Sequence, residues 1–589
     1  MKEKWLEVRK SADFAAISKK FNIHPVTARI MRNRELISED DMDVFLHGDE
    51  THLHDPFLMK DMELATEIVI TKISAKKRIR IINDYDVDGV CSGYILLCGL
   101  KSCGAMVDIV TPDRIKDGYG MNASLVNAAF TDGIDTIITC DNGIAAIDSV
   151  NMAKELGMTV IVTDHHNVPY RELEDGKKEY LKSNADAVVN PKQDDCPYPY
   201  KELCGASVAW KFIQALFCKM NLSSSNAFSY VEFAGFATVC DVMSLTGENR
   251  IIVKLALKML RQTQNPGMLA LIAESKLEKE NIKAYHIGFI LGPCINASGR
   301  LDTAKKALQL LCTASYPQAR TLAAELVLLN EKRKELTEAG IDAAVQEIEN
   351  NRLLLDKVMV VYLADCHESI AGIIAGKIRD RYYRPVFILA KTADGFLKGS
   401  GRSIEEYSMY DEMNKVSDVF LGFGGHPMAA GLSLELENLD AFRKRINENC
   451  SLTDDDVIPK IKIDVPVPID YTSCEMVREL EILEPFGKDN HKPVFADRNV
   501  KIKRASILGK NKNVLKMELL SSSGRSVPGI YFGNAYEFLG FMQDKFGEEE
   551  VASALLGKEN AITLSIVYDM NINEYNYVET PQVVIRNYC

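Results

Sequence analysis

Three aspartates stand at every second position in the stretch "IINDYDVDGV" (residues 81–90), namely Asp84, Asp86 and Asp88. They directly follow a run of β-branched apolar residues, which is typical of a buried strand. Carboxylates this close together repel one another and resist ionising together unless a positive charge lies among them. The spacing therefore predicts a cation site at the end of a strand.

Acidic, imidazole and amide side chains also follow three later apolar runs. "TCDNGI" supplies Asp141, "VTDHHN" supplies Asp164, His165 and His166, and "VVNP" supplies Asn190. A single strand-end Asp is as often a helix N-cap or a turn residue, and adjacent histidines are often a surface pair. The recurrence of such residues at several strand ends favours a metal site over these alternatives.

The donor types indicate which metal and which chemistry. Carboxylates and imidazoles without thiolates suit Mn²⁺ or Mg²⁺, and the histidines favour Mn²⁺. There are enough donors for one or two ions, and two ions would stabilise both the attacking water and the leaving oxygen of a phosphate ester. We therefore predict metal-assisted phosphoester hydrolysis.

Two further charged residues belong near this centre. Asp241, in "GFATVCDVMSL", lies in a largely apolar segment where an ionised carboxylate is costly without a partner. We interpret it as a further metal ligand, the alternative being an N-cap at the turn toward "MSL". Arg114, in "TPDRIKDGYG", follows the second strand and is placed either to bind phosphate or to pair with an acid.

The elements that position these residues alternate between strands and helices. Five β-rich runs, separated by helical segments, cover residues 78–83, 106–112, 135–140, 159–164 and 186–191. Near-continuous apolar strands of this kind predict a parallel sheet covered on both faces, so the fold class is α/β. The carboxyl ends of parallel strands converge on one crevice, which would bring the acidic residues together.

The rest of the chain divides into five parts. The first fifty residues predict short helices, and helices should dominate from 205 to 264. Residues 317–350 predict a long helix, which we interpret as a spacer between domains; the alternative is an ordinary packed helix. Gly340 is expected to weaken this helix. A second α/β unit follows, with strands at 358–364 and 385–390, and short alternating strands after about 459 predict an all-β domain of the small-barrel type.

Composition limits the functional classes. The chain has 589 residues, 47% of them hydrophobic and 26% charged, and its start lacks the apolar core of a signal peptide, so we expect a cytoplasmic protein without a membrane span. The 14 cysteines are scattered without a C-x-x-C pair, which fits a reducing compartment. The net charge of −13 argues against a nucleic-acid binder that uses its whole surface.

One local stretch departs from the acidic average. Residues 499–525 carry seven Lys or Arg and one Glu. This stripe either binds nucleic acid or is a solvated strand face. Its candidate nucleic-acid-binding residues are Lys501, Lys503, Arg504, Lys510 and Lys512.

The motifs "DYDVDG", "CDNG" and "DHH", in that order, resemble the DHH phosphoesterase superfamily. "GASVAWK", "GPCINASGRLDTA", "GSGRS" and "GGHPMAAGL" extend the likeness to its bacterial single-strand-specific exonucleases, over nearly the whole chain. The resemblance implies a DHH domain with a Mn²⁺ or Mg²⁺ centre, a DHHA1 domain that grips the strand, and an OB-like domain that binds DNA. The parts we expect are a helical segment at 1–50, the DHH domain at 51–315, a connecting helix at 316–352, the DHHA1 domain at 353–450 and the OB-like domain at 451–589.

The resemblance also assigns roles to single residues. The implied metal ligands are Asp86, Asp88, Asp141, His165 and Asp241. His166 matches a position that contacts the scissile phosphate, and together with the five ligands it makes up the catalytic set, while Asp84 and Asp164 would orient ligands. The positions implied to hold the nucleic-acid backbone are Asn296, Arg300, Arg402 and His426. The chain departs from the pattern at Cys294, where an Arg is usual, and at 366–369.

The function implied is that of a processive nuclease that degrades single-stranded DNA from its 5′ end and releases 5′-mononucleotides. Such an enzyme would serve recombination and repair beside a helicase or a single-strand-binding protein, and we expect a monomer. One alternative is a DHH phosphatase of short oligonucleotides or cyclic dinucleotides, which needs no basic β-domain. The other is a DNA-binding scaffold with a decayed site, which the competent side chains at all metal positions disfavour.

Overall fold

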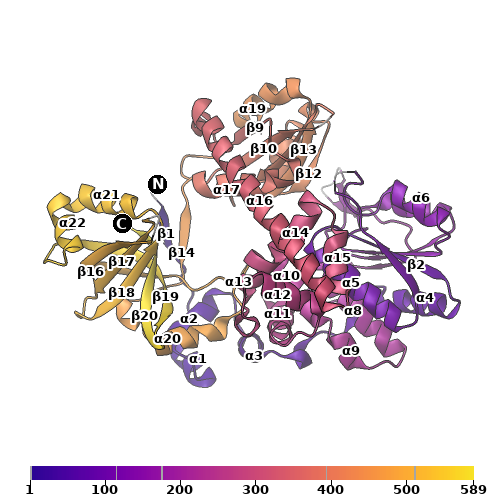
Figure 1. Ribbon diagram of the computed structural model, residues 1–589, viewed down its shortest axis with the longest axis horizontal. Coiled ribbons are helices and arrows are strands. Elements are labelled where there is room, and N and C mark those ends of the chain that lie inside the picture. The colour runs from indigo at the N-terminus through magenta and orange to yellow at the C-terminus, as the bar shows by residue number, and fades with distance from the viewer. Residues whose placement is uncertain (1–2, 115, 174–176, 393, 510–511) are drawn as a thin grey trace. The chain divides into compact units, whose positions relative to one another are not determined.

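The computed structural model of the protein describes residues 3–114, 116–173, 177–392, 394–509 and 512–589. The packing of the chain divides it into two compact units (Figure 1). The first unit contains residues 53–243 and 251–459, and the second contains 3–52, 244–250 and 460–589.

The first unit opens with a five-stranded sheet whose neighbouring strands all pair in parallel. The strand order is β3-β2-β4-β5-β8, with the bounds β2 Arg78–Asn83, β3 Met106–Val110, β4 Thr136–Cys140, β5 Thr159–Thr163 and β8 Ala187–Val189. The chain moves from β2 outward to β3 and then returns to the other side of β2 to form β4. The order therefore reverses at β2, and ligands of parallel sheets bind beside such a reversal.

Helices cover this sheet, and further helices form a helical body beside it. The helices next to the sheet are α4 Met62–Ser74, α5 Val87–Ser102, α6 Ala123–Thr131, α7 Ile147–Glu155 and α8 Gly205–Lys219. The helical body continues with α9 Ser224–Phe228, α10 Val231–Cys240, α11 Gly247–Leu260, α12 Pro266–Glu274, α13 Ala284–His286, a π-helical segment Ile287–Leu291, α14 Gly292–Leu301 and α15 Lys305–Cys312. The predicted parallel sheet and the predicted helical region are both confirmed. A short antiparallel hairpin, β6 Tyr170–Glu172 and β7 Lys178–Tyr180, was not foreseen.

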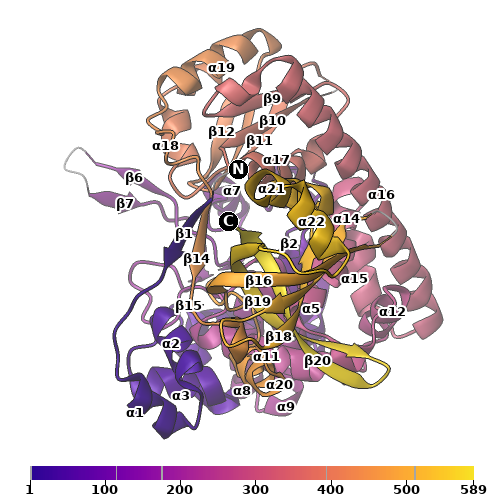
Figure 2. The same cartoon turned by 90° about the vertical axis from the view of Figure 1, so that its left-hand side faces the viewer.

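Helix α16 spans Tyr316–Asn350 without interruption, 35 residues in all (Figure 2). It is packed along its length, against α12, α14 and α15 in its first part and against β9 and α17 further on, so it joins two bodies without being a bare spacer. The helix continues through Gly340 without a break. A Cβ at Gly340 would lie 2.4 Å from Ile374 Cδ1, so the glycine permits the close approach of α17.

The second sheet of the first unit is mixed, with the order β12-β13-β11-β10-β9. Strands β9 and β10 pair in parallel and the other pairs are antiparallel. Its elements are β9 Met359–Leu363, α17 Ala371–Tyr382, β10 Val386–Lys391, β11 Leu397–Arg402, α18 Met409–Asn414, β12 Gly422–His426, β13 Ala429–Leu434 and α19 Leu439–Glu448. The prediction of a second α/β unit is confirmed.

The second unit is built on a barrel. Its strands are β15 Val465–Pro466, β16 Phe495–Leu508, β17 Val514–Leu520, β18 Ser526–Phe532, β19 Thr563–Tyr575 and β20 Val578–Tyr588. The order is β15-β16-β17-β18-β20-β19, and β19 pairs back onto β16 and closes the ring, which confirms the predicted barrel. The all-β expectation is incomplete, because three helices belong to this domain: α20 Cys474–Leu480, α21 Ala535–Phe546 and α22 Glu548–Leu555.

The N-terminal segment shares a hydrophobic core with the barrel. It holds the three short helices that were expected, α1 Phe14–Phe21, α2 Pro25–Asn33 and α3 Glu39–His47, and also a strand, β1 Lys4–Glu7, which pairs in parallel with β14 Lys460–Ile463. Ile30 and Met31 of α2 lie in one core cluster with Val467 and Leu480. The bounds of the five predicted parts stay predictions.

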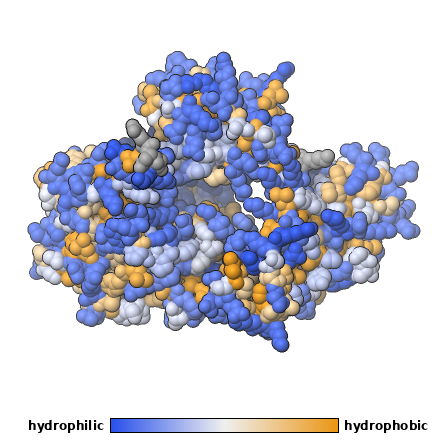
Figure 3. Space-filling view, turned by 180° about the vertical axis from the view of Figure 1, so that it is seen from behind, coloured by the Kyte–Doolittle hydropathy of each residue, from blue (hydrophilic) through white to orange (hydrophobic). Residues whose placement is uncertain are grey.

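The surface seen in Figure 3 is mainly hydrophilic, and its hydrophobic residues lie in small separate patches. Among the residues described, no helix is both long enough and apolar enough to cross a bilayer.

Candidate metal centre

Four of the five predicted ligands lie at the carboxyl ends of β2, β4 and β5, which are neighbours in the sheet, and the fifth, Asp241, lies at the end of α10. Asp86 is the N-cap of α5, where its carboxylate accepts a hydrogen bond of 3.1 Å from the Gly89 N–H. Asp141 follows β4 directly with φ at +59°. A non-glycine residue seldom adopts this left-handed conformation, and the strain is tolerated where it aims a functional side chain.

Asp88 is buried and connects the first turn of α5 to the start of α8. Its two carboxylate oxygens accept hydrogen bonds from the backbone N–H groups of Gly205 at 2.6 Å and Ala206 at 2.7 Å. These groups are the first of α8, where the helix dipole also favours negative charge. A Cβ on Gly205 would lie 2.7 Å from Asp141 Cβ, so this position in "GASVAWK" must be glycine for α8 to reach the centre.

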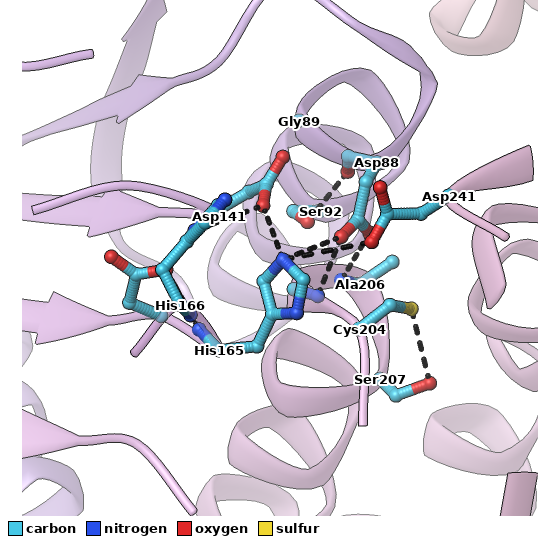
Figure 4. Close-up of polar contacts among 12 residues, drawn as sticks. Asp88, Gly89, Ser92, Asp141, His165, His166, Cys204, Ala206, Ser207 and Asp241 are labelled. Atoms are coloured by element: carbon cyan, nitrogen blue, oxygen red, sulfur yellow. Dashed lines mark hydrogen bonds and ion pairs between the residues drawn. The ribbon is translucent and has the colours of Figure 1, made fainter. Parts of the chain in front are cut away.

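His165 stands among three carboxylates (Figure 4). Its Nε2 lies 3.1 Å from an Asp141 oxygen, 3.5 Å from an Asp88 oxygen and 3.7 Å from an Asp241 oxygen. Burial, together with the nearby His166, lowers the pKa of His165 to about 3, so its imidazole is neutral and can offer a lone pair to a metal. Asp241 is the C-cap of α10, so the alternative of an N-cap is wrong.

Asp164 holds His166 in place. One Asp164 oxygen accepts hydrogen bonds from the backbone N–H groups of His165 at 2.7 Å and His166 at 3.1 Å, and it lies 2.8 Å from His166 Nδ1. The other accepts the Ile144 N–H at 2.9 Å. Burial opposes both charges, but the pairing outweighs it: the pKa of Asp164 falls to about 2 and that of His166 rises to about 9. His166 is therefore an oriented imidazolium.

The donor atoms form three overlapping groups, and within each group they lie within 4.8 Å of one another. The groups are Asp84 with Asp86 and Asp141, Asp88 with His165 and Asp241, and Asp141 with His165 and His166. Asp84 thus lies close to the donors, and the orienting role expected of it stays a prediction.

The electrostatics of these groups fit the binding of a cation. Burial, followed by repulsion from neighbouring carboxylates, raises the pKa of Asp84, Asp141 and Asp241 well above the ordinary range and that of Asp88 to about 6. One oxygen of Asp84 is buried without a hydrogen-bond partner among the described residues. Hard cations bind such oxygen-rich sets, so the centre is a site for Mn²⁺ or Mg²⁺.

A cavity of about 360 Å³ adjoins this centre. From the first α/β body it is lined by Tyr85, Arg114 and Tyr119, and the Tyr119 hydroxyl donates a hydrogen bond of 2.8 Å to the Asp141 carbonyl. From the second sheet it is lined by Glu368, Ser369, Lys398, Gly399, Ser400, Gly422, Phe423, Gly424, Gly431, Leu432 and Ser433. A Cβ at Gly422 or Gly424 would meet no atom within 4 Å, so these glycines leave open space that side chains would occupy.

Three of the predicted phosphate-binding arginines gather here. Arg300 donates a hydrogen bond of 2.6 Å to the Ser369 carbonyl, which links the two α/β bodies of the first unit. Burial, followed by repulsion from Arg114, lowers the pKa of Arg300 to about 10, and burial with Arg379 and Arg114 also lowers that of Arg402. This local positive charge suits a phosphate.

The other predicted nucleic-acid residues are less concentrated. The side-chain oxygen Oδ1 of Asn296 accepts the Val87 N–H at 3.2 Å and so supports the metal-binding turn, and His426 is exposed at the end of β12. In the second unit Lys503 pairs with Glu518 at 2.6 Å. Lys501 is half-buried on β16, Arg504 is exposed there, Lys512 is exposed in the loop that follows, and Lys510 lies outside the described residues.

Sequence reasoning missed three features of this centre. The α8 amides that bind Asp88 are one, and the Tyr119 hydroxyl is another, although "DGYG" ends a stretch already singled out for Arg114. The third is the location of Asp84 among the donors. The unusual Cys294 is buried, and the Asn330 side chain of α16 donates to its sulfur at 3.4 Å, so it packs against α16.

The fold and the centre together define a metal-dependent phosphoesterase of the DHH class. The family model "DHH family, N-terminal domain" matches residues 78–235, "DHHA1 domain" matches 355–452 and "RecJ OB domain" matches 463–587.

Named relatives narrow the class. The chain is 34% identical over 575 residues to the single-stranded-DNA-specific exonuclease RecJ of Bacillus subtilis, covering 97% of this chain and 69% of that protein. It is 31% identical over 553 residues to the Escherichia coli exonuclease of the same name, covering 90% of each. The crystal structure of RecJ in complex with Mn²⁺ from Thermus thermophilus matches with a TM-score of 0.80 at 25% identity, over 100% of this chain and 79% of that one. The chain belongs to the RecJ family of single-stranded-DNA-specific exonucleases.

Proposed function

We propose that this chain degrades single-stranded DNA from its 5′ end and releases 5′-mononucleotides. The observation that carries the proposal is the cavity of about 360 Å³ that adjoins the metal centre. It lies at the small end of the range for ligand pockets, roughly 300–1,000 Å³, which suits a single nucleotide. A terminal nucleotide held there places its 3′ phosphodiester at the carboxylates.

The metal ligands in this proposal are Asp86, Asp88, Asp141, His165 and Asp241, with Asp84 beside them. A bound divalent ion would supply Lewis acidity, which activates water and neutralises charge on the phosphate. The amides of Gly205 and Ala206 keep Asp88 ionised and oriented toward the centre.

His166 acts on the phosphate in this proposal. Its Nδ1 is engaged by Asp164, and its Nε2 lies 3.3 Å from the Tyr119 hydroxyl at the border of the cavity. An imidazolium fixed in this way can donate a hydrogen bond to a non-bridging oxygen as negative charge develops. Asp164 positions the ring and makes its positive charge favourable.

Selection for single strands follows from size and charge. A base pair cannot enter a cavity that holds one nucleotide, whereas a single strand can deliver its end. Arg114, Arg300 and Arg402 supply forked donors for the terminal phosphates, while Lys398 of the lining is paired with Glu368 at 3.3 Å. The glycine positions on β12 and β13 let a sugar or base lie against bare backbone.

The cellular part of the proposal rests on family membership. It places the enzyme in the cytoplasm, as a monomer, in recombination and repair beside a helicase or a single-strand-binding protein. The barrel of the second unit, with its basic stripe at 499–525, would hold the strand that feeds the centre.

The small size of the cavity also fits a phosphatase of short oligonucleotides or cyclic dinucleotides. A nuclease time course separates the two functions. Long single-stranded DNA, labelled at the 5′ or the 3′ end, is incubated with Mn²⁺ and the chain, with Asp141→Ala as control. Immediate release of labelled mononucleotide from the 5′ end, with gradual shortening of the 3′-labelled strand, is expected. Intact long DNA beside cleaved dinucleotides would favour the second function.

A further inference from the structure

Asn190 directly follows β8, the edge strand of the parallel sheet, and is fully buried. The sequence pattern placed it with the strand-end donors of the metal centre. In the structure its side-chain oxygen accepts the Lys192 N–H at 2.7 Å, and its side-chain nitrogen donates to the His166 carbonyl oxygen at 2.9 Å. An amide binds a metal ion through its oxygen, and here that oxygen faces a backbone N–H. These contacts favour a supporting role over metal binding.

The backbone around Asn190 explains why its side chain reaches the histidines. Strand β8 pairs in parallel with β5, and the Val189 carbonyl oxygen accepts the Asp164 N–H at 3.1 Å. Pro191 comes next, and a residue before a proline is restricted to extended conformations, which suits a residue that continues the line of a strand. Asn190 therefore stands beside the segment that follows β5.

His166 lies beyond the paired part of β5, so other contacts must hold its backbone. On its N-terminal side, the Asp164 carboxylate accepts the His166 N–H at 3.1 Å. On its C-terminal side, Asn167 is exposed and the chain continues to the hairpin of β6 and β7. The hydrogen bond from Asn190 holds the His166 carbonyl on this side. Asp164 and Asn190 together fix the backbone of His166 at both ends.

A fixed backbone also aims the His166 ring. The His166 side chain is 40% exposed, so packing alone does not hold it. Asp164 lies 2.8 Å from Nδ1, and Nε2 lies 3.3 Å from the Tyr119 hydroxyl at the border of the nucleotide cavity. Hydrogen bonds to the N–H and the C=O of His166 restrict its φ and ψ, and with them the direction of the side chain. A misplacement of about 1 Å can lower a reaction rate about hundred-fold, so this restriction affects catalysis.

The alternative is that Asn190 serves only the turn that it begins. That turn has support of its own, because the Gln193 side chain donates to the Val188 carbonyl oxygen at 2.7 Å. The two roles use different atoms of Asn190: the oxygen serves the turn, and the nitrogen serves His166. Asn190→Asp keeps the oxygen and the shape but removes the donor. Asn190→Ala removes both groups without adding a charge.

We propose that Asn190 is a positioning residue, which fixes the His166 carbonyl and so aims the imidazolium at the scissile phosphate. The inference rests on the proposed function, in which His166 donates a hydrogen bond to a non-bridging oxygen. Asn190 touches neither the metal nor the substrate in this role. It therefore contributes to the rate of hydrolysis and not to the binding of Mn²⁺ or DNA.

Steady-state hydrolysis of a single-stranded oligonucleotide in Mn²⁺ tests the proposal. Asn190→Asp and Asn190→Ala should each lower kcat about ten- to hundred-fold, as loss of support around a functional group does, with KM within about two-fold of the wild type. Mn²⁺ affinity measured by calorimetry should stay unchanged. The matched control is Asn447→Asp on α19, where the Asn447 side chain donates to the Val358 carbonyl oxygen at 2.9 Å and accepts the Val358 N–H at 3.0 Å. This control should keep the wild-type kcat.

A double-mutant cycle shows whether Asn190 acts through His166. In His166→Ala, the further change Asn190→Asp should lower kcat by less than about two-fold, because a positioning residue has no effect once the group that it positions is gone. An equal loss in both backgrounds, or a wild-type kcat in both Asn190 variants, would overturn the proposal while the exonuclease function stands. A fall in Mn²⁺ affinity of about ten-fold or more would also overturn it, because Asn190 would then support the metal centre as a whole.

A measurement without substrate separates this proposal from the proposed function. In the metal-free protein with histidines labelled at Cε1, the NMR signal of His166 is assigned by its absence in His166→Ala. The signal should shift or broaden in Asn190→Asp and stay in place in Asn447→Asp. An unchanged signal in Asn190→Asp would overturn the positioning role whether or not the chain cleaves DNA. A wild type that leaves the oligonucleotide intact would overturn the proposed function and the proposal that rests on it.

Discussion

The substitution Gly205→Ala, which adds a single methyl group, should impair the metal centre while the fold stays intact. In Gly205→Ala the new Cβ would meet Asp141 Cβ at 2.7 Å and the Asp141 backbone at 3.0 Å. Ordinary contact begins at 3.4 Å, so α8 or the Asp141 turn must move by about 0.7 Å. Neither side is the flexible end of a long side chain, so the contact cannot relax without a backbone shift.

That shift acts on the two hydrogen bonds that hold Asp88. If the whole shift fell on them, their lengths of 2.6 and 2.7 Å would increase to about 3.3 and 3.4 Å, beyond the usual range of about 2.7–3.2 Å for an N–H···O bond. Hydrogen bonds to a charged group contribute about 1.5–3 kcal/mol each, and loss of such support around a ligand lowers metal affinity about ten- to hundred-fold. We expect Mn²⁺ affinity and kcat/KM of Gly205→Ala to fall by that factor, and the free energy of unfolding by only about 1–3 kcal/mol.

Calorimetric titration with Mn²⁺ and the nuclease time course measure both effects, and thermal unfolding in EDTA measures the stability. The matched control is Gly376→Ala on α17 of the same unit, where the new Cβ meets no atom within 4 Å. It should bind Mn²⁺ as the wild type does and gain up to about 1 kcal/mol from helix propensity. Wild-type Mn²⁺ affinity in Gly205→Ala would refute the argument that α8 must approach Asp141 this closely.

Three further results are expected. Asp84→Asn should lower Mn²⁺ affinity about ten-fold or more, because the residue lies among the donors, and an unchanged affinity in the titration would return it to an orienting role. In EDTA, the pKa of His166 is about 9 in the folded protein, above its ordinary value of 6.5, so folding favours the charged imidazolium. The resulting stabilisation is fully present below pH 6.5 and is lost as the pH rises through about 9. Thermal unfolding across this range should show the loss in the wild type and not in Asp164→Asn. Gly424→Val should obstruct the nucleotide cavity and raise KM for DNA at least about ten-fold without changing Mn²⁺ affinity, whereas a normal KM would place the terminal nucleotide elsewhere.

Much of the fold was accessible from local patterns. The strands of the first sheet were found because they are short, apolar and β-branched, and the parallel arrangement follows from the helices between them. Helix α16 was found from its period and from Pro317 in its first turn. The helices of the C-terminal domain were missed although α21 buries Ala535, Phe538, Leu539 and Met542 at helical spacing, because the surrounding strands dominated the interpretation.

What local patterns could not supply was packing between distant segments. No sequence feature pairs β1 with β14 or places α2 in the core of the barrel, because those contacts depend on shape and hydrophobic burial across more than four hundred residues. The same holds within the site. Asp88 could be recognised as a ligand from its motif, but its two amide partners come from a helix that begins 117 residues later.

The centre also shows why its ligands tolerate so little change. Each carboxylate needs two conditions that oppose each other: burial, which raises its pKa, and ionisation, which a metal ligand requires. Asp88 meets both through the α8 amides, and Asp164 does so through His166 and the Ile144 N–H. Asp84, Asp141 and Asp241 have a raised pKa that their neighbours do not offset, so their charge depends on the cation itself. At pH 8, where Asp88 with its pKa of about 6 is already ionised, metal binding should therefore release protons from this second group and not from the first. The proton release measured in buffers of different ionisation enthalpy should fall in Asp241→Asn but persist in Asp164→Asn.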